Sequence, residues 1–180
     1  PLSRMEQADM DRLLRVSELD DETQNALERT FDESVFPVLT PLAVDSGHPF
    51  PYISNLSLSL AVELEEATRD GIELHFARVK IPPTLPRFVG VGEAANGERR
   101  FVLLEDLISH HLDVLFPGMH VRDSYLFRVT RDADLDLQED EADDLLRAIE
   151  SELRRRRFGE PVRLEIERGM PEYMRDFLCT

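Results

Sequence analysis

The sequence contains one cysteine, one lysine, no tryptophan and no long apolar run, and these shortages narrow the kinds of protein it can be. Cys179 alone cannot build an internal disulfide framework or a cysteine-based metal cage, which favours a reducing compartment. No run of about 18 apolar residues occurs, and no basic stretch precedes an apolar leader core. We therefore expect a cytoplasmic protein without a transmembrane segment.

Positive charge is scarce as well. The chain has 21 Lys and Arg against 37 Asp and Glu, a formal net charge of −16. Such a charge repels other polyanions, which argues against a dedicated nucleic-acid binder. With 180 residues, 42% of them hydrophobic and 32% charged, the chain has a globular composition and the length of one ordinary domain. Because it starts at Pro1 without a Met, we expect a piece of a longer polypeptide.

Hydrophobic spacing predicts helices at the start of the chain and strands after them. Helical periodicity covers residues 4–16 and 21–36, with Asp20 or Asp21 as the N-cap of the second helix. Pro37 and Pro41 forbid further helix, so the segment after them is predicted to be extended. Alternating apolar residues predict strands, the first two forming a hairpin, at 56–64, 74–81, 87–91, 100–103, 125–130 and 162–166. Further helices are predicted at 104–115, at 139–157 and from 171 onward.

These elements indicate an α+β fold. We expect a mostly antiparallel sheet packed with helices in a two-layer sandwich, preceded by an N-terminal helical pair. The sequence contains no complete catalytic motif: the phosphate-binding loop, the dinucleotide fingerprint and the nucleophile elbow are all missing. None of its five histidines has metal-binding spacing. His48 lies in a proline-rich loop, where we expect loop-structuring residues, namely Pro37, Thr40, Pro41, His48 and Pro51.

Two sets of charged residues remain as candidates for binding. The acids from Asp132 to Asp144 lack the glycine and terminal glutamate of a calcium loop, and carboxylates also favour the positive end of a helix dipole. An arginine fork binds phosphate through two hydrogen bonds, so arginines on neighbouring strands could form an anion-binding surface despite the net charge. The alternative is that they pair with the surplus acids. The arginines concerned are Arg87, Arg128, Arg131 and Arg163.

Several strings of residues, taken in order, resemble polyphosphate kinase of type 1, and specifically its middle or head domain. The resemblance covers nearly the whole chain, and residues 1 to about 35 are its least distinctive part. The strings are Phe36-Pro37-Val38-Leu39-Thr40-Pro41, His48-Pro49-Phe50-Pro51, Ile53-Ser54-Asn55-Leu56, Phe127-Arg128-Val129-Thr130-Arg131-Asp132 and Pro161-Val162-Arg163-Leu164-Glu165.

The resemblance implies a four-part intracellular enzyme that reversibly transfers the terminal phosphate of ATP onto inorganic polyphosphate. That family uses magnesium and a phosphohistidine in its C-terminal part, and no histidine here matches that position. The chain alone is therefore expected to be inactive and to hold no cofactor. Its partners would be other domains and subunits of the same enzyme, a homo-oligomer, and polyphosphate through the full protein. A membrane association through that parent enzyme stays open.

By the same resemblance, residues 1–35 would link to a preceding helical domain, and residues 36–180 would form the middle domain. That domain would be a scaffold for subunit contacts and would wall the polyphosphate passage. Arg128, Arg131, Arg87 and Arg163 are the candidates for contact with polyphosphate or with another domain. Two other functions stay open: a stand-alone phosphate- or phosphohistidine-binding module, and a metal-dependent hydrolase that uses the acids at 132–144.

Overall fold

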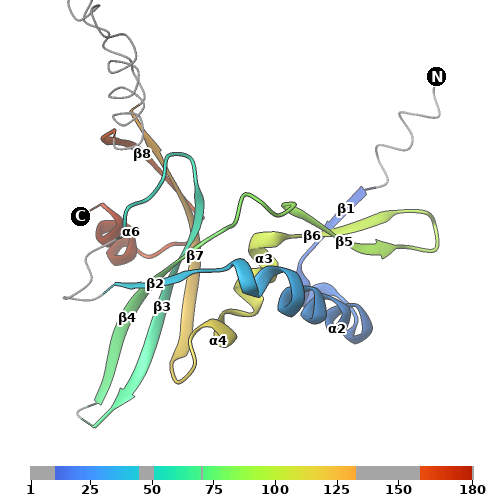
Figure 1. The fold of residues 1–180 in the computed structure, drawn as a ribbon, viewed down its shortest axis with the longest axis horizontal. Coiled ribbons are helices and arrows are strands. Elements are labelled where there is room, and N and C mark those ends of the chain that lie inside the picture. The colour runs from blue at the N-terminus through green and yellow to red at the C-terminus, as the bar shows by residue number, and fades with distance from the viewer. Residues whose placement is uncertain (1–10, 45–50, 70, 133–158, 180) are drawn as a thin grey trace, which may run out of the picture.

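The computed structural model describes residues 11–44, 51–69, 71–132 and 159–179. These residues form two sheets and several helices. Figure 1 shows the three-stranded sheet and helix α2 on one side of the molecule and the five-stranded sheet on the other, with helix α3 between them. The α+β class and the mostly antiparallel pairing agree with the sequence-based prediction. None of the helices described is long and apolar enough to cross a membrane.

The larger sheet has the strand order β2-β4-β3-β7-β8, and all of its neighbours pair antiparallel. The predicted hairpin is confirmed: β3 and β4 pair from Ser59 with Lys80 to Thr68 with Gly71. Gly71 has φ +139°, a backbone conformation that only glycine adopts without strain. The strands are β2 (Pro41–Val44), β3 (Leu58–Thr68), β4 (Gly71–Lys80), β7 (His120–Arg131) and β8 (Pro161–Ile166).

The smaller sheet has the order β1-β6-β5 and consists of β1 (Asp11–Leu14), β5 (Phe88–Glu93) and β6 (Arg99–Leu103). Its existence corrects two expectations. The third and fourth predicted strands form a separate sheet, and the part of residues 4–16 that is described contains a strand instead of a helix. β1 pairs in parallel with β6, and the Arg99 guanidinium donates two hydrogen bonds, of 2.8 and 2.7 Å, to the Asp11 carboxylate. This tertiary pairing outweighs the helical spacing of the apolar residues.

Helix α2 (Asp21–Thr30) begins at Asp20, whose carboxylate accepts a hydrogen bond of 2.9 Å from the Thr23 N–H. A wider helical turn follows at Phe31–Val35, and a tight 3₁₀ turn at Phe36–Val38 comes before β2. The extended segment predicted after α2 therefore starts only beyond that turn. Pro37 fits at the start of this turn, because the first residues of a helical turn donate no hydrogen bond within it and the missing N–H of proline therefore costs nothing.

The helix predicted at 104–115 is interrupted. It forms α3 (Leu104–His110) and α4 (Leu112–Leu115), because His111 adopts φ −114° and ψ 22° between them. The last helix, α6, covers Glu172–Leu178. The predicted helix at 139–157 lies outside the described residues.

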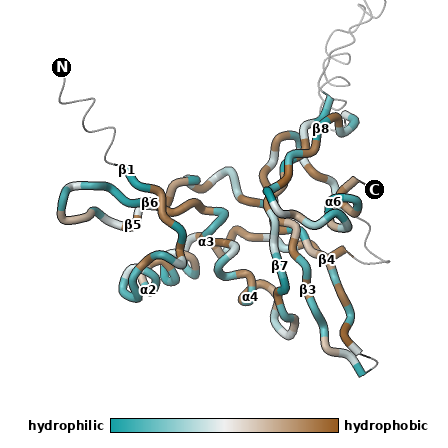
Figure 2. Tube along the Cα trace, turned by 180° about the vertical axis from the view of Figure 1, so that it is seen from behind, coloured by the Kyte–Doolittle hydropathy of each residue, from teal (hydrophilic) through white to brown (hydrophobic). Residues whose placement is uncertain are grey.

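Two hydrophobic clusters lie on opposite faces of the five-stranded sheet. The larger one joins α2, α3, the small sheet and one face of β3, where Leu60 and Val62 are buried with Phe31 and Leu107. The other cluster lies under α6 and includes Phe127, Val129 and Met174. Figure 2 shows the apolar segments gathering in the interior between α3 and β3 and beneath α6. We call these the α3 face and the α6 face of the sheet.

Candidate functional site

Strand β7 carries two of the four candidate arginines, Arg128 and Arg131, and their side chains lie on opposite faces of the sheet. Phe127 and Val129 belong to the cluster under α6, while Leu126 packs against the cluster on the α3 face. Side chains of a strand alternate between the two faces of its sheet. Arg128 accordingly lies on the α3 face and Arg131 on the α6 face, and each lines a different cavity.

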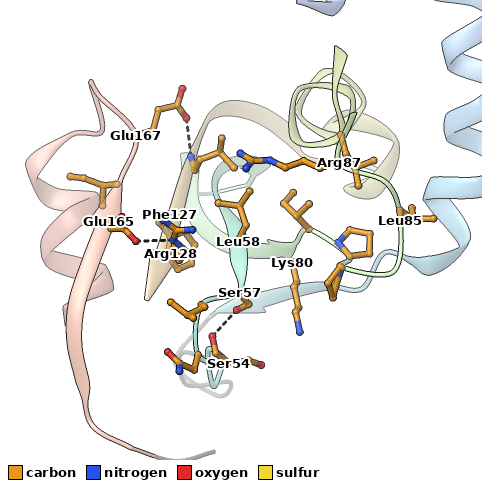
Figure 3. Close-up of a pocket in the computed structure, with 18 residues that line it drawn as sticks. Ser54, Ser57, Leu58, Lys80, Leu85, Arg87, Phe127, Arg128, Glu165 and Glu167 are labelled. Atoms are coloured by element: carbon orange, nitrogen blue, oxygen red, sulfur yellow. Dashed lines mark hydrogen bonds and ion pairs between the residues drawn. The ribbon is translucent and has the colours of Figure 1, made fainter. Parts of the chain in front are cut away.

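The cavity on the α3 face has a volume of about 730 Å³ and lies between the loop before β3, the connection from β4 to β5, and strands β7 and β8. We call it the arginine pocket, because Arg87, Arg128 and Lys80 line it. Figure 3 shows Arg87 reaching across the pocket toward the strand that carries Arg128. A hydrogen bond to Glu105 raises the pKa of Arg87, and burial and the positive charge of Arg128 partly offset that rise. Two of the predicted arginines therefore converge here.

A buried glutamate holds Arg87 in place. The Nε of Arg87 donates to Oε1 of Glu105 at 2.9 Å, and the Nη2 of Arg87 donates to the same oxygen. Glu105 is only 2% exposed, and its other oxygen has no hydrogen-bond partner. This hydrogen bond raises the pKa of Arg87. The sequence gives no sign of this role, because Glu105 lies in the first turn of a helix, where acidic residues are common.

Arg128 is held by a carboxylate of the neighbouring strand. Its Nε donates to Oε2 of Glu165 at 2.7 Å, and Arg163 contacts the other oxygen of Glu165 at 3.1 Å. The hydrogen bond raises the pKa of Arg128 and lowers that of Glu165. Lys80, the only lysine of the chain, lines the pocket without an ion pair to any acid of the described residues.

The loop before β3 forms another wall of the pocket and has a defined shape. Leu56 adopts φ +58° and donates its N–H to the Val129 carbonyl at 2.8 Å. The Ser57 hydroxyl donates to the Ser54 carbonyl at 2.8 Å. A left-handed residue other than glycine is uncommon and depends on its surroundings, so the wall is locally constrained.

Arg131 lines a second cavity on the α6 face with Tyr52 and Pro51. Arg163 borders that cavity too, but its guanidinium lies on the α3 face, where it contacts Glu165. Among the loop-structuring candidates, Pro37 lies in the 3₁₀ turn, Thr40 is exposed and Pro41 starts β2. His48 lies outside the described residues.

The acids at 133–144 also lie outside the described residues. Among the residues that are described, no group of three or more His, Cys, Asp or Glu side chains is arranged to hold a metal ion. The His111 ring stacks on Phe31 with centroids 4.5 Å apart, and its Nδ1 lies 2.9 Å from the Leu107 carbonyl oxygen. Its environment is that of a half-buried histidine packed against the core.

Comparison with known proteins shows which family the chain belongs to. Residues 22–180 match the family model described as the polyphosphate kinase middle domain. The chain belongs to the polyphosphate kinase family. It is 52% identical over 171 residues to the polyphosphate kinase of Synechocystis sp., and the match covers 91% of this chain and 23% of that protein. With the polyphosphate kinase of Streptomyces coelicolor it shares 51% identity over 166 residues, covering 92% of this chain and 21% of the relative.

The fold agrees with a solved member of the same family. The crystal structure of polyphosphate kinase from Porphyromonas gingivalis matches 98% of this chain with a TM-score of 0.73 and 29% sequence identity. The match covers 24% of that protein, so the chain spans about a quarter of a polyphosphate kinase or slightly less. The resemblance stated from the sequence is confirmed for both the family and the middle domain.

Proposed function

We propose that this chain is the non-catalytic middle domain of an enzyme that reversibly transfers the terminal phosphate of ATP onto inorganic polyphosphate. The observation that carries the proposal is the match of residues 22–180 to the polyphosphate kinase middle domain. The chain spans less than a quarter of the Synechocystis enzyme. The ATP, the magnesium and the phosphohistidine of the parent enzyme would belong to its other parts, and the chain alone would be inactive.

In this proposal residues 1–35 connect the middle domain, residues 36–180, to a preceding helical domain. Packing supports a fixed connection instead of a loose linker. Leu27 and Phe31 of the connecting segment are 3% and 0% exposed, and they share a core with Leu60 and Val62 of the sheet. Movement of the preceding domain would therefore be transmitted to the five-stranded sheet.

The arginine pocket is our proposed contact between the middle domain and the polyphosphate chain. Arg87 and Arg128 are each oriented by a carboxylate through Nε, which leaves Nη1 of Arg87 and both terminal nitrogens of Arg128 without hydrogen bonds to described residues. Oriented guanidinium groups bind phosphate with less loss of entropy than mobile ones. Lys80 adds a third cation to the same cavity.

The test is the steady-state kinetics of the intact enzyme with Arg128→Gln. Losing one charge-assisted hydrogen bond to phosphate raises the KM for polyphosphate by about tenfold, while kcat and the KM for ATP stay unchanged. Arg99→Gln is the matched control, because Arg99 is also an exposed arginine paired with a carboxylate, on the three-stranded sheet. Equal effects of the two substitutions would refute a role for the arginine pocket in polyphosphate binding.

A further inference from the structure

The loop before β3, residues 51–57, takes part in both cavities of the five-stranded sheet, and we call it the β3 loop. Residues 51–53 line the cavity on the α6 face, and residues 54–57 line the arginine pocket on the α3 face. The loop therefore passes from one face of the sheet to the other. Figure 3 shows its second half, with Ser54 and Ser57, at the arginine pocket. A contact that fixes residues 51–53 can thus influence the pocket on the opposite face.

Arg131 of β7 holds this loop through its side chain and its backbone. Its Nε donates to the Ile53 carbonyl at 2.7 Å, and its Nη1 donates to the Gly159 carbonyl at 2.8 Å. The carbon of the guanidinium lies 4.4 Å from the centre of the Tyr52 ring. The backbone N–H of Arg131 donates to Oδ1 of Asn55 at 2.8 Å. One residue thereby joins the β3 loop to β7 and to the residues before β8.

Gly159, at the far end of this bridge, is held by the backbone of β7. The Asp132 N–H donates to the Glu160 carbonyl, next to Gly159, at 2.8 Å. A Cβ at position 159 would collide with the Asp132 carbonyl oxygen, so only glycine allows the two segments to lie so close together. The guanidinium of Arg131 is therefore bound at one end to a position that cannot move freely.

The backbone of β7 also holds the second half of the loop, beside Arg128. The Leu56 N–H donates to the Val129 carbonyl at 2.8 Å. Arg128 itself is the partner of Leu58 at the start of β3. The β3 loop thus continues along β7 next to the proposed polyphosphate contact, and a displacement of the loop would change the space around Arg128.

The loop depends on such contacts, because its conformation is unfavourable for the residues that form it. Leu56 has φ +58°, in the left-handed region that costs a leucine more than a glycine. Such a conformation persists only where the surroundings fix it. The Tyr52 carbonyl accepts a further hydrogen bond, of 3.0 Å, from the buried Arg78. Arg78 and Arg131 thus hold consecutive carbonyls of the loop, those of Tyr52 and Ile53.

We propose that Arg131 is a positioning residue for polyphosphate binding, which acts from the α6 face by holding the β3 loop in the shape that walls the arginine pocket. Arg131 is not among the residues that line the arginine pocket, and it acts on phosphate only through the loop. This role differs from the direct contact for which the sequence made Arg131 a candidate. The inference rests on the proposed function, because it requires that polyphosphate contacts the arginine pocket.

The first measurement is hydrogen exchange of the β3 loop in the intact enzyme, with and without Arg131→Gln. The N–H groups of Leu56 and Ser57 are hydrogen-bonded, to the carbonyls of Val129 and Ser54. We expect them to exchange about tenfold faster in the variant, since the loop opens more often once the guanidinium is lost. The amides that pair within the β3–β4 hairpin keep their rates.

The second measurement is the steady-state kinetics of the same enzyme. We expect Arg131→Gln to raise the KM for polyphosphate by about fivefold, the factor for one ordinary hydrogen bond, while kcat and the KM for ATP stay unchanged. A purely structural arginine would leave the KM for polyphosphate unchanged. Arg175→Gln is the matched control, because it removes one positive charge from the same side of the sheet. The partner of Arg175 is Glu172, at 2.8 Å, within α6.

Tyr52→Leu is the second variant, and it decides the matter if Arg131→Gln does not fold. It removes the ring that lies against the guanidinium and changes no charge. We expect the same two effects at a smaller size, about twofold in each. Tyr52 lines the cavity on the α6 face and not the arginine pocket, so its effect on the KM for polyphosphate has to pass through the loop.

Three results would overturn the inference while the proposed function stands, because Arg128→Gln still raises the KM for polyphosphate. They are unchanged exchange in the β3 loop, an unchanged KM despite faster exchange, and an equal rise in the KM with Arg175→Gln. If Arg128→Gln leaves the KM unchanged as well, the proposed function itself fails, and the inference that rests on it fails with it.

Discussion

At the scale of single residues, the arginines of this chain differ in the acceptor that each guanidinium faces. Arg87 and Arg128 face carboxylates, whereas Arg78 and Arg131 face carbonyl oxygens. The acids concerned lie 18 and 37 residues away along the chain. The sequence neighbours of an arginine therefore do not predict whether its guanidinium is paired with an acid. That depends on which residues the fold brings to the guanidinium.

Glu105→Gln tests whether the buried carboxylate stabilises the protein through Arg87. The substitution keeps the size of the side chain but removes a charge-assisted hydrogen bond, so we expect a loss of about 1–3 kcal/mol in the free energy of unfolding. Urea denaturation of the chain measures it. The control is Glu98→Gln, whose partner Arg12 lies 3.9 Å away and is 66% exposed. A surface pair of that kind contributes about 0–1 kcal/mol. Equal losses would contradict a special role for Glu105.

At the scale of elements, the start of α2 depends on one side chain. Asp20 accepts the Thr23 N–H, and this hydrogen bond is the largest cause that lowers the pKa of Asp20. We expect Asp20→Ala to lower the melting temperature of the chain, because the helix loses the side chain that caps its first turn. Asp21→Ala is the matched control, because the helix itself begins at Asp21. Thermal melting of both variants shows the difference, and a larger effect at Asp21 would disprove the assignment of the cap.

Helix α6 is attached to the sheet through Tyr173, whose hydroxyl donates to the buried carboxylate of Glu63 at 2.9 Å. Burial, followed by the hydrogen bond to Glu63, raises the pKa of Tyr173 to about 12. Because the folded state has the higher pKa, the contribution to stability is complete below the ordinary tyrosine pKa of about 10. It is lost as the pH rises from there through about 12.

We therefore expect the free energy of unfolding to fall between pH 10 and pH 12 and to fall less in Tyr173→Phe. Chemical denaturation across this pH range provides the measurement. Tyr125 also has a raised pKa, through burial and through Asp123 and Glu63, so Tyr125→Phe is the second variant. An identical pH profile for the wild type and Tyr173→Phe would show that the contact with Glu63 does not attach α6.

The segments with alternating apolar residues form strands, because alternation places the apolar side chains of a strand on the one face that packs against the core. The β3–β4 hairpin is the clearest case, since Leu60, Val62 and Leu64 all face the α3 side. The prediction was wrong for residues 11–14, whose strand is decided by β6 far along the chain. It also missed the break at His111, where the ring stacks on Phe31 of another helix. Both misses come from contacts distant in sequence.

At the scale of the whole molecule, the β3–β4 hairpin extends beyond the core and leaves apolar side chains in solvent. Ile72 and Leu74 are 71% and 50% exposed, and β2 pairs with β4 only from Phe76 to Val79. The end of β4 near Gly71 pairs with β3 on one side only, and its other side has no partner strand among the described residues. Edges of this kind are common sites of association. Such an edge suits the subunit contacts that the resemblance to polyphosphate kinase implies for this domain.

We expect Ile72→Gln to weaken the self-association of the intact enzyme without lowering the melting temperature of the chain. Burying an isoleucine side chain contributes about 1.5–3 kcal/mol, which corresponds to a rise in the dissociation constant of about tenfold or more. Sedimentation over a range of concentrations gives this constant. Leu13→Gln is the control, since Leu13 is 53% exposed on the other sheet. An unchanged dissociation constant would remove the hairpin from the proposed subunit interface.

The sequence by itself determined the α+β class, the hairpin and the family, and it narrowed the cap of α2 to Asp20 or Asp21. These follow from local spacing, from single side chains and from continuous strings of residues, none of which needs knowledge of distant contacts. It also identified Arg87, Arg128, Arg131 and Arg163 as a set. Only the tertiary structure divided them between two faces, because a strand alternates its side chains. Only the tertiary structure brought Glu105 to Arg87 and Glu165 to Arg128, and left Arg131 facing carbonyl oxygens. Burial and charge pairing depend on residues that lie far apart along the chain and meet only in the fold.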